Sequence, residues 1–530
     1  MKKKTFSLLG LLCLFFGTLP AQTGEIYLVR FDKKCEQEFD PWTYFDSAAI
    51  HRKQAQGLPL SDWYDLPLCD AYVDSISHTG AAIRHQLRWF NGVSVWATAK
   101  QLDGIKQLSF VTSVEYLGER SLQLASDPRP PRNYDTLLSL QRGLLELDTL
   151  LARGLSGRGV RIAIFDAGFK EANTHPALAQ MREAGNLVAY HDFFGVDGQV
   201  FHHSRHGTEV MSCISGHFGD RQLGAAPNAE FILARVEHKI FEPAREEDNW
   251  LAAVEWADRL GARIINSSLT YSSKRYRFEE MDGKTAPVSQ AASIATQKGI
   301  LVINSIGNEG LEKKPYLGAP ADVPEVLTVG GSLPMLEERI PFSSFGPNAQ
   351  GEMKPELSAP AYVLTAWKRG AYSENAGTSF AAPLITGIAA CLLEEDSSLL
   401  PAELHQRLCE AGHRYPYFDH ELGYGVLKAG RLFGAPDTTS AAYKVGFKGD
   451  SVILAFDTLN LATDSAHYPH GRMLYFHLED PAGQLISAQT IRIPNGSHYY
   501  YFLKPRDAFG VLRIWFADGL FEQRLSLNEE

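Results

Sequence analysis

Short apolar segments alternate with amphipathic segments of helical periodicity between residues 135 and 434. This alternation predicts a parallel sheet with helices on both faces, because buried parallel strands are joined through crossover helices. The carboxyl ends of such strands are where open α/β sheets place their sites. The expected strands are 160–166, 187–191, 230–236, 263–267, 300–304 and 326–330, and the expected helices are 142–153, 206–217, 246–260, 286–298, 379–395 and 402–411.

The residues before this region predict a small α+β domain, with strands at 25–31, 90–97 and 111–116 and helices at 72–85 and 101–108. Residues 126–133 hold three prolines, which disfavour helix and central strand, so they form a linker and a natural place for processing. After residue 437, short strands predict a β-sandwich. Those strands are 452–456, 473–477, 486–493, 499–503, 511–516 and 521–527, with hairpin turn signals at 494–497 and 517–519.

The first 21 residues combine lysines, an apolar run over 6–16 and a small residue, Ala21, at a plausible cleavage point. This is typical of a signal peptide and predicts a secreted or cell-surface protein. The net charge of −11 argues against a nucleic-acid partner, and no later apolar run reaches the length of a membrane span. The expected domains are 1–21 (signal peptide), 22–128, 135–434 and 437–530.

Five cysteines follow the signal peptide, and their odd number and wide spacing do not indicate a disulfide framework. Cys35 with Cys69 is the pair to test. Cys213 and Cys391 lie on the expected buried faces of helices, where a free thiol behaves as a small apolar group.

Three segments carry the side chains of an acyl-transfer triad. Asp166 ends an apolar strand, His206 opens a helix as His-Gly-Thr, and Ser379 lies in Gly-Thr-Ser-Phe-Ala-Ala-Pro. A serine becomes nucleophilic when a histidine takes its proton, and a carboxylate orients that histidine. The order Asp, His, Ser differs from the orders in chymotrypsin and in α/β-hydrolases.

At these residues, and at Asn304–Gly310, the chain resembles the subtilases, the subtilisin-like serine peptidases, over about 300 residues. The resemblance implies a three-layer α/β/α fold and a secreted, self-processing serine endopeptidase that acts on polypeptides. It implies Asp166, His206 and Ser379 as the triad and Asn308 as the oxyanion donor beside the Ser379 N–H. The domain at 22–128 would be a propeptide that inhibits the enzyme. Ala167 stands where the family usually has Ser or Thr.

The same resemblance assigns substrate binding to two segments, one of which pairs with an extended peptide as an added strand. Thr270 and Ile306 stand where family members commonly have Gly and Ala, so the pocket for the residue before the scissile bond should be small. The expected substrate-binding residues are Ser268, Leu269, Thr270, Ser305, Ile306 and Gly307.

No cofactor is expected. Calcium is common in the family, but the candidates, Asp220 and the turn Glu279, Glu280 and Asp282, lack regularly spaced oxygen ligands and indicate surface turns. His202 and His203 lie near His206, but no carboxylate or thiol stands at metal-ligand spacing.

Two other functions remain open at this point. The chain could be an inactive subtilase scaffold that serves as a binding or adhesion module. Alternatively, the C-terminal sandwich could carry the main role as a carbohydrate or surface anchor, with Tyr499, Tyr500, Tyr501 and Trp515 as its aromatics. Alternating apolar positions in strands are more often core than a ligand platform.

Overall fold

The computed structural model describes residues 24–35, 37–117, 133–195, 198–237, 246–271, 276–312, 316–334 and 336–434, and in the C-terminal part 443–448, 451–456, 472–480, 485–494, 497, 499–503, 510–516 and 519–525. The expected signal peptide and linker residues 126–132 lie outside the described residues, as do residues 495–496 and 517–518 of the two expected turns.

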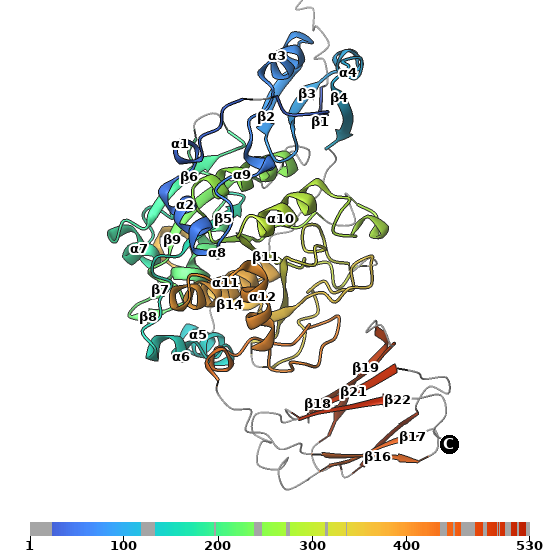
Figure 1. Ribbon diagram of the computed structural model, residues 1–530. Helices are drawn as coiled ribbons and strands as arrows, with labels where there is room; N and C mark the ends of the chain where they lie inside the picture. Colours follow the sequence, from blue (N-terminus) through green and yellow to red (C-terminus); the bar gives the residue numbers. More distant parts are fainter. Residues whose placement is uncertain are drawn as a thin grey trace, which may run out of the picture.

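A seven-stranded parallel sheet forms the centre of the molecule, in the order β13-β12-β11-β10-β5-β9-β6 (Figure 1). The six expected strands are confirmed to within two residues at each end. The seventh, β13, was not among the six expected strands. The strands are β5 (Arg161–Asp166), β6 (Leu187–Asp192), β9 (Glu230–Arg235), β10 (Ile264–Ser267), β11 (Leu301–Ser305), β12 (Leu327–Ser332) and β13 (Leu357–Pro360).

The sheet is buried on both faces, because successive side chains of a strand point to opposite sides. Ile162 and Ile164 of β5 pack in one apolar cluster with α8 and α11, whereas Ala163 and Phe165 pack in another with α9 and α10. The expected three-layer α/β/α fold is therefore confirmed. The helices of this domain are α5 (Tyr134–Leu144), α6 (Leu147–Ala152), α7 (Ala179–Glu183), α8 (His206–Ser215), α9 (Glu246–Arg259), α10 (Pro287–Gln297), α11 (Thr378–Glu395) and α12 (Pro401–Glu410).

One expected helix of the central domain is divided. The helix expected at 142–153 is two helices, α5 and α6, because Glu146 takes a left-handed conformation (φ 56°) that a continuous helix excludes. Two hairpins were not expected, β14 (Tyr362–Ala366) with β15 (Tyr372–Ala376) and the short β7 (His217–Phe218) with β8 (Arg221–Gln222).

The N-terminal domain is a four-stranded antiparallel sheet, in the order β2-β3-β1-β4, with helices α3 and α4 on one face. The helix expected at 72–85 is wrong beyond His78, since Gly80 (φ 82°) follows its end and the next residues form β2. Helices α1 and α2 were not expected. The elements are β1 (Glu25–Phe31), α1 (Pro41–Tyr44), α2 (Ser47–Ala55), α3 (Asp70–His78), β2 (Ala82–Leu87), β3 (Gly92–Ala97), α4 (Ala99–Lys106) and β4 (Val111–Tyr116).

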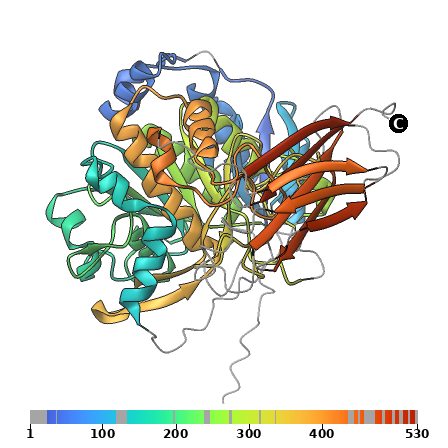
Figure 2. The same cartoon turned by 90° about the horizontal axis from the view of Figure 1, so that it is seen from below.

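The C-terminal domain consists of a three-stranded sheet (β16-β17-β20) and a four-stranded sheet (β19-β18-β21-β22), both antiparallel (Figure 2). Both sheets contribute to one apolar core, so the expected β-sandwich is confirmed. The hairpin expected at 494–497 is wrong, because β19 and β20 lie in different sheets. The strands are β16 (Tyr443–Lys448), β17 (Ser451–Phe456), β18 (Arg472–Glu479), β19 (Leu485–Ile493), β20 (Tyr499–Leu503), β21 (Gly510–Phe516) and β22 (Gly519–Leu525).

The four-stranded sheet of the sandwich packs against the central domain. Tyr475 and Trp515 form an apolar cluster with Tyr417, and the Arg414 guanidinium lies 4.5 Å from the centre of the Tyr475 ring. Trp515 is therefore buried in a contact between domains and is not part of an exposed aromatic platform. The side chains of Tyr499, Tyr500 and Tyr501 lie outside the described part of the chain.

Candidate active site

Asp166 and His206 form a hydrogen-bonded pair at the carboxyl end of the central sheet. Asp166 is the last residue of β5 and is fully buried. His206 is the first residue of α8, and its Nδ1 lies 2.9 Å from both carboxylate oxygens of Asp166. The Ala167 backbone N–H also donates to Asp166 Oδ1, at 2.7 Å. The carboxylate thus fixes Nδ1 as the protonated nitrogen and leaves Nε2 free to accept a proton.

The glycine after this aspartate allows the pair to form. Gly168 has φ 143°, and a Cβ at this position would lie 2.7 Å from the Ser204 backbone nitrogen. The Gly168 carbonyl also accepts a hydrogen bond from the Gly207 N–H at 3.0 Å. A glycine here therefore lets the segment before α8 approach the end of β5 closely enough to bring His206 onto Asp166.

Ser379 lies in the first turn of α11 and is 7% exposed. Pro383 is in the second turn and not in the first, so it cannot give the helical N–H that the Ser379 carbonyl would accept. The Ser268 hydroxyl donates to this carbonyl instead, at 2.9 Å. Because Pro383 leaves the Ser379 carbonyl without a helical donor, the hydrogen bond from Ser268 can link the expected nucleophile to the segment expected to bind substrate.

No hydrogen bond joins His206 and Ser379 in the described part of the chain, but His206 lies close to the residue that follows the serine. The His206 ring centre is 5.5 Å from that of Phe380, the residue after the serine. The Ser379 hydroxyl lies 3.5 Å from the Ser268 carbonyl oxygen. Hydrogen bonds between a nucleophile and its base are often long or poorly aligned before substrate binds.

Asn308 is exposed and is held by the start of the same helix. Its Oδ1 accepts from the Thr378 backbone N–H at 2.9 Å and from the Thr378 hydroxyl at 3.1 Å. With the oxygen engaged in this way, the amide presents its N–H₂ group as a donor. Gly307 before it has φ 115°, and a Cβ there would lie 2.6 Å from a Glu309 carboxylate oxygen.

The two expected substrate-binding segments lie at the carboxyl ends of the neighbouring strands β10 and β11. A bridge between Tyr271 and Ala319 continues the first segment, with backbone hydrogen bonds of 2.9 and 3.0 Å. Thr270 faces Gly318, where an added Cβ would lie 3.0 Å from the Thr270 Cβ. Ile306 is fully buried against Leu317 and Ala321, so it belongs to the packed wall between these segments.

Sequence reasoning missed two carboxylates near the His–Asp pair. Glu237 follows β9, the neighbour of β5, by two residues, and Glu209 lies in the first turn of α8. Burial lowers the pKa of His206, but the charge and hydrogen bond of Asp166, with smaller contributions from Glu209 and Glu237, raise it to about 9. Burial and the Asp166 charge raise the pKa of Glu237 to about 7. The signal available in the sequence was the position of Glu237, an acidic residue just after a strand that neighbours β5.

We expect activity to rise with pH in the alkaline range, because His206 must be neutral to accept a proton. A pKa near 9 moves this rise above the neutral region expected of an unperturbed histidine. Glu237→Gln removes one negative charge near the ring, so the rise in kcat/KM should shift to lower pH. Glu230→Gln, at the other end of the same strand, is the matched control. A Glu237→Gln profile that overlays the wild-type profile would contradict this assignment.

Within the described part of the chain, no group of three or more His, Cys, Asp or Glu side chains could hold a metal ion. The carboxylate of Asp282, one of the calcium candidates, instead accepts hydrogen bonds from Lys284 and Thr285. Helix α11 is long and apolar enough to cross a membrane, but 89% of its residues are buried inside the protein. This helix is therefore the core helix that carries Ser379.

Comparison with known proteins matches two parts of the chain to family models. Residues 157–425 match the subtilase family (Peptidase S8), and residues 26–133 match the Peptidase S8 propeptide domain of Bacteroidota. The chain belongs to the subtilase family. The subtilases are serine-type endopeptidases, and the N-terminal domain of this subtilase is a propeptide domain.

Three curated relatives illustrate the range of the similarity. Alkaline serine exoprotease A of Vibrio alginolyticus is 25% identical over 65% of this chain and 58% of its own length. Subtilisin E of Bacillus subtilis is 26% identical over 63% of this chain and 79% of its own length. The thermostable alkaline protease of Halalkalibacterium halodurans is 28% identical over 53% of this chain and 69% of its own length. The match thus spans less than two thirds of the Vibrio enzyme.

Two solved structures also match the subtilase. A cold-adapted subtilisin-like serine proteinase is 24% identical, with a TM-score of 0.41, over 52% of this chain and 90% of its own. A protease of Pseudoalteromonas arctica is 21% identical, with a TM-score of 0.45, over 58% of this chain and 98% of its own.

Proposed function

We propose that this subtilase is a secreted endopeptidase that cleaves polypeptides through an acyl-enzyme on Ser379. The observation that carries the proposal is the Asp166–His206 pair, at 2.9 Å, beside the helix turn that holds Ser379 and Asn308. Cleavage of an internally quenched peptide at an internal bond, identified from the masses of the products, tests the endopeptidase activity. Release of single terminal residues only would contradict it.

In the proposed mechanism, His206 Nε2 takes the Ser379 proton as the hydroxyl oxygen attacks the scissile carbonyl carbon. Asp166 stabilises the imidazolium that forms. The carbonyl oxygen becomes an oxyanion that accepts from Asn308 Nδ2 and the Ser379 N–H. His206 then gives the proton to the leaving amine, and a water molecule hydrolyses the acyl-enzyme by the same steps. No cofactor enters this proposal.

Self-processing is the first prediction of this proposal. The enzyme should cut its own chain between about Glu119 and Tyr134, a stretch that includes the proline-rich linker, a natural place for processing. Ser379→Ala protein should then accumulate as a precursor, detected from the N-terminal sequence and intact mass in a host lacking other proteases. Normal maturation of this variant in that host would show that another enzyme performs the cut.

The second prediction is a preference for small or medium apolar residues before the scissile bond. Thr270 adds three heavy atoms relative to Gly, and Ile306 adds three relative to Ala, at segments that border the proposed pocket. Overpacking costs about 1–3 kcal/mol, which corresponds to roughly ten- to hundredfold discrimination against an aromatic side chain. Peptide-library profiling of wild type and Thr270→Gly measures this preference. Strong wild-type cleavage after Phe, unchanged in the variant, would mean that these side chains point away from the pocket.

A further inference from the structure

The propeptide domain contains a long segment outside its four-stranded sheet. Residues 32–69, here called the strap, lie between β1 and α3 and include α1 and α2. Phe45, Ala49 and Ile50 form a small apolar core within the strap. The disulfide Cys35–Cys69, the pair singled out in the sequence, joins its two ends. Figure 1 shows α1 and α2 away from the propeptide sheet and beside the peptidase domain.

The strap contacts the peptidase domain at the amino ends of the central strands. The Asp46 N–H donates to the Arg259 carbonyl at 2.9 Å, and the Gln56 amide donates to the Gly299 carbonyl at 3.2 Å. A Cβ at Gly261 would lie 2.5 Å from the Ala49 nitrogen, so the two surfaces are in close contact. Gly261 and Gly299 precede β10 and β11, so this contact is at the opposite edge of the sheet from the triad.

Buried ion pairs cross this contact. Arg52 of the strap pairs with Asp258 of α9, and the two side chains are 1% and 2% exposed. Lys298 of the peptidase domain lies 2.7 Å from Asp65 of the strap, and both side chains are 1% exposed. Removing one partner of such a pair leaves the other charge buried and unpaired, which chiefly accelerates dissociation.

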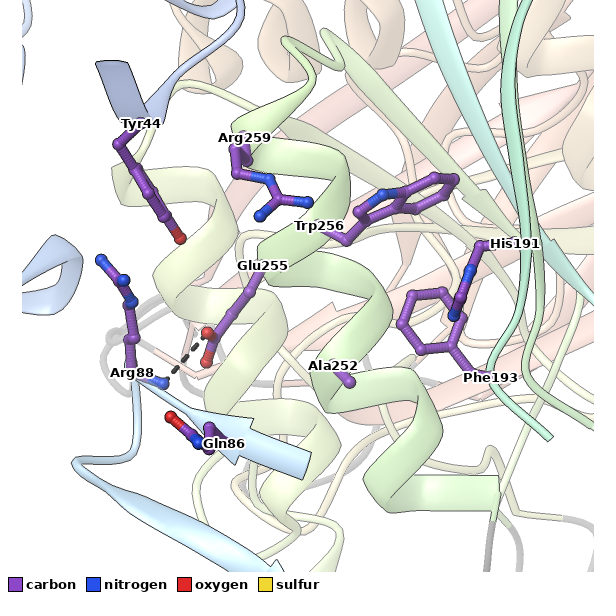
Figure 3. A pocket seen from close by; sticks show the side chains of 9 residues that line it. All are labelled: Tyr44, Gln86, Arg88, His191, Phe193, Ala252, Glu255, Trp256 and Arg259. Carbon is purple, nitrogen blue, oxygen red and sulfur yellow. Dashed lines mark hydrogen bonds between the residues drawn. The ribbon is translucent and has the colours of Figure 1, made fainter. Parts of the chain in front are cut away.

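The propeptide sheet makes a separate contact with the peptidase domain. Its outer face packs on α9 and α10, and the Glu255 carboxylate accepts the backbone N–H groups of Arg88 and Trp89 at 3.0 and 2.9 Å. A cavity of about 390 Å³ lies where this contact meets the strap. Figure 3 shows Tyr44 of the strap on one side of the cavity and Trp256 of α9 on the other. The strap and the sheet are thus two distinct docking surfaces.

We propose that the strap holds the propeptide on the peptidase domain after the linker is cut. A fragment bound at two surfaces dissociates only when both are open together, because the bound surface keeps the other at a high effective concentration. The strap therefore lengthens the lifetime of the two-chain complex that cleavage of the linker leaves. The inference goes beyond the proposed function and does not depend on the triad, so it can be tested in an inactive variant.

The test uses full-length Ser379→Ala protein that is immobilised through a C-terminal tag. A brief trypsin treatment cuts the chain between Glu119 and Tyr134, a stretch that contains Arg120, Arg129 and Arg132. The N-terminal fragment retained on the resin is measured over time under continuous washing. We expect retention for hours, and loss about 30-fold faster or more when Arg52→Met is added. Lys33→Met, an exposed cation of the same segment, is the matched control and should retain the fragment as the parent does.

A second measurement uses the parent protein alone and so does not depend on a variant that has to fold without Arg52. Dithiothreitol is added after the folded parent has been cut, so that reduction of Cys35–Cys69 frees the two ends of the strap and raises its conformational entropy when detached. Loss of the fragment should accelerate. Loss of the parent fragment within minutes would overturn the proposal. The proposal would also be overturned if the Arg52→Met and Lys33→Met proteins retained the fragment equally and dithiothreitol had no effect on its loss.

Discussion

Ser379→Ala is expected to lower kcat by about 10⁶ with little change in KM. Loss of the serine or the histidine alone has an effect of this size in subtilisin, a member of this family, because the two side chains act as one unit. The expectation here rests on the position of Ser379 in the first turn of α11, with the Asp166–His206 pair beside it. Initial rates on an internally quenched peptide measure the loss.

His206→Ala should reduce kcat as far as Ser379→Ala does, and the double variant should be no slower than either single one. His202→Ala is the matched control, because this exposed neighbour is expected to take no part in the reaction. A His202→Ala enzyme as inactive as His206→Ala, with unchanged folding, would instead favour a different base or a metal site.

Asn308→Asp is expected to lower kcat by about 10²–10³. Loss of one oxyanion-hole donor has this effect in subtilisin, because the donor is already oriented where charge develops in the transition state. The substitution is isosteric. It keeps an oxygen for the two Thr378 donors at 2.9 and 3.1 Å but removes the amide N–H₂ group. Kinetics with a peptide substrate should therefore show the change in kcat and not in KM.

Covalent labelling by a fluorophosphonate separates this role from a structural one. An Asn308→Asp enzyme with its nucleophile intact and correctly folded should still be labelled, although more slowly. Kinetics indistinguishable from those of wild type would show that Asn308 does not contact the oxyanion.

Most of the central fold could be predicted from the sequence, because its strands are buried apolar runs and its helices have a clear apolar face. The pattern is local, and so is its failure at 72–85 in the N-terminal domain. There, Gly80 follows the end of a helix, and residues 82–87 form a strand. The sandwich hairpin at 494–497 failed for a different reason. A turn signal shows that the chain reverses, but it does not show whether the next strand joins the same sheet.

The candidate site was predicted at the level of its motifs, and the structure adds the contacts that motifs do not contain. The hydrogen bond from Ser268 to the Ser379 carbonyl joins residues 111 positions apart. The strap could not be predicted, because its buried face carries Arg52 and Lys53, cations that a sequence pattern assigns to solvent. Arg52 pairs with Asp258 of the peptidase domain and Lys53 with Asp65 of the strap, and only tertiary contact reveals these partners.

The proposed mechanism requires Ser379 to be the nucleophile and His206 to activate it. Labelling the purified mature enzyme with a fluorophosphonate, and locating the adduct by peptide mass mapping, tests both roles. We expect one adduct, on the peptide that contains Ser379, which is absent in Ser379→Ala and strongly reduced in His206→Ala. An adduct on another serine, or an active enzyme that is not labelled at all, would contradict it.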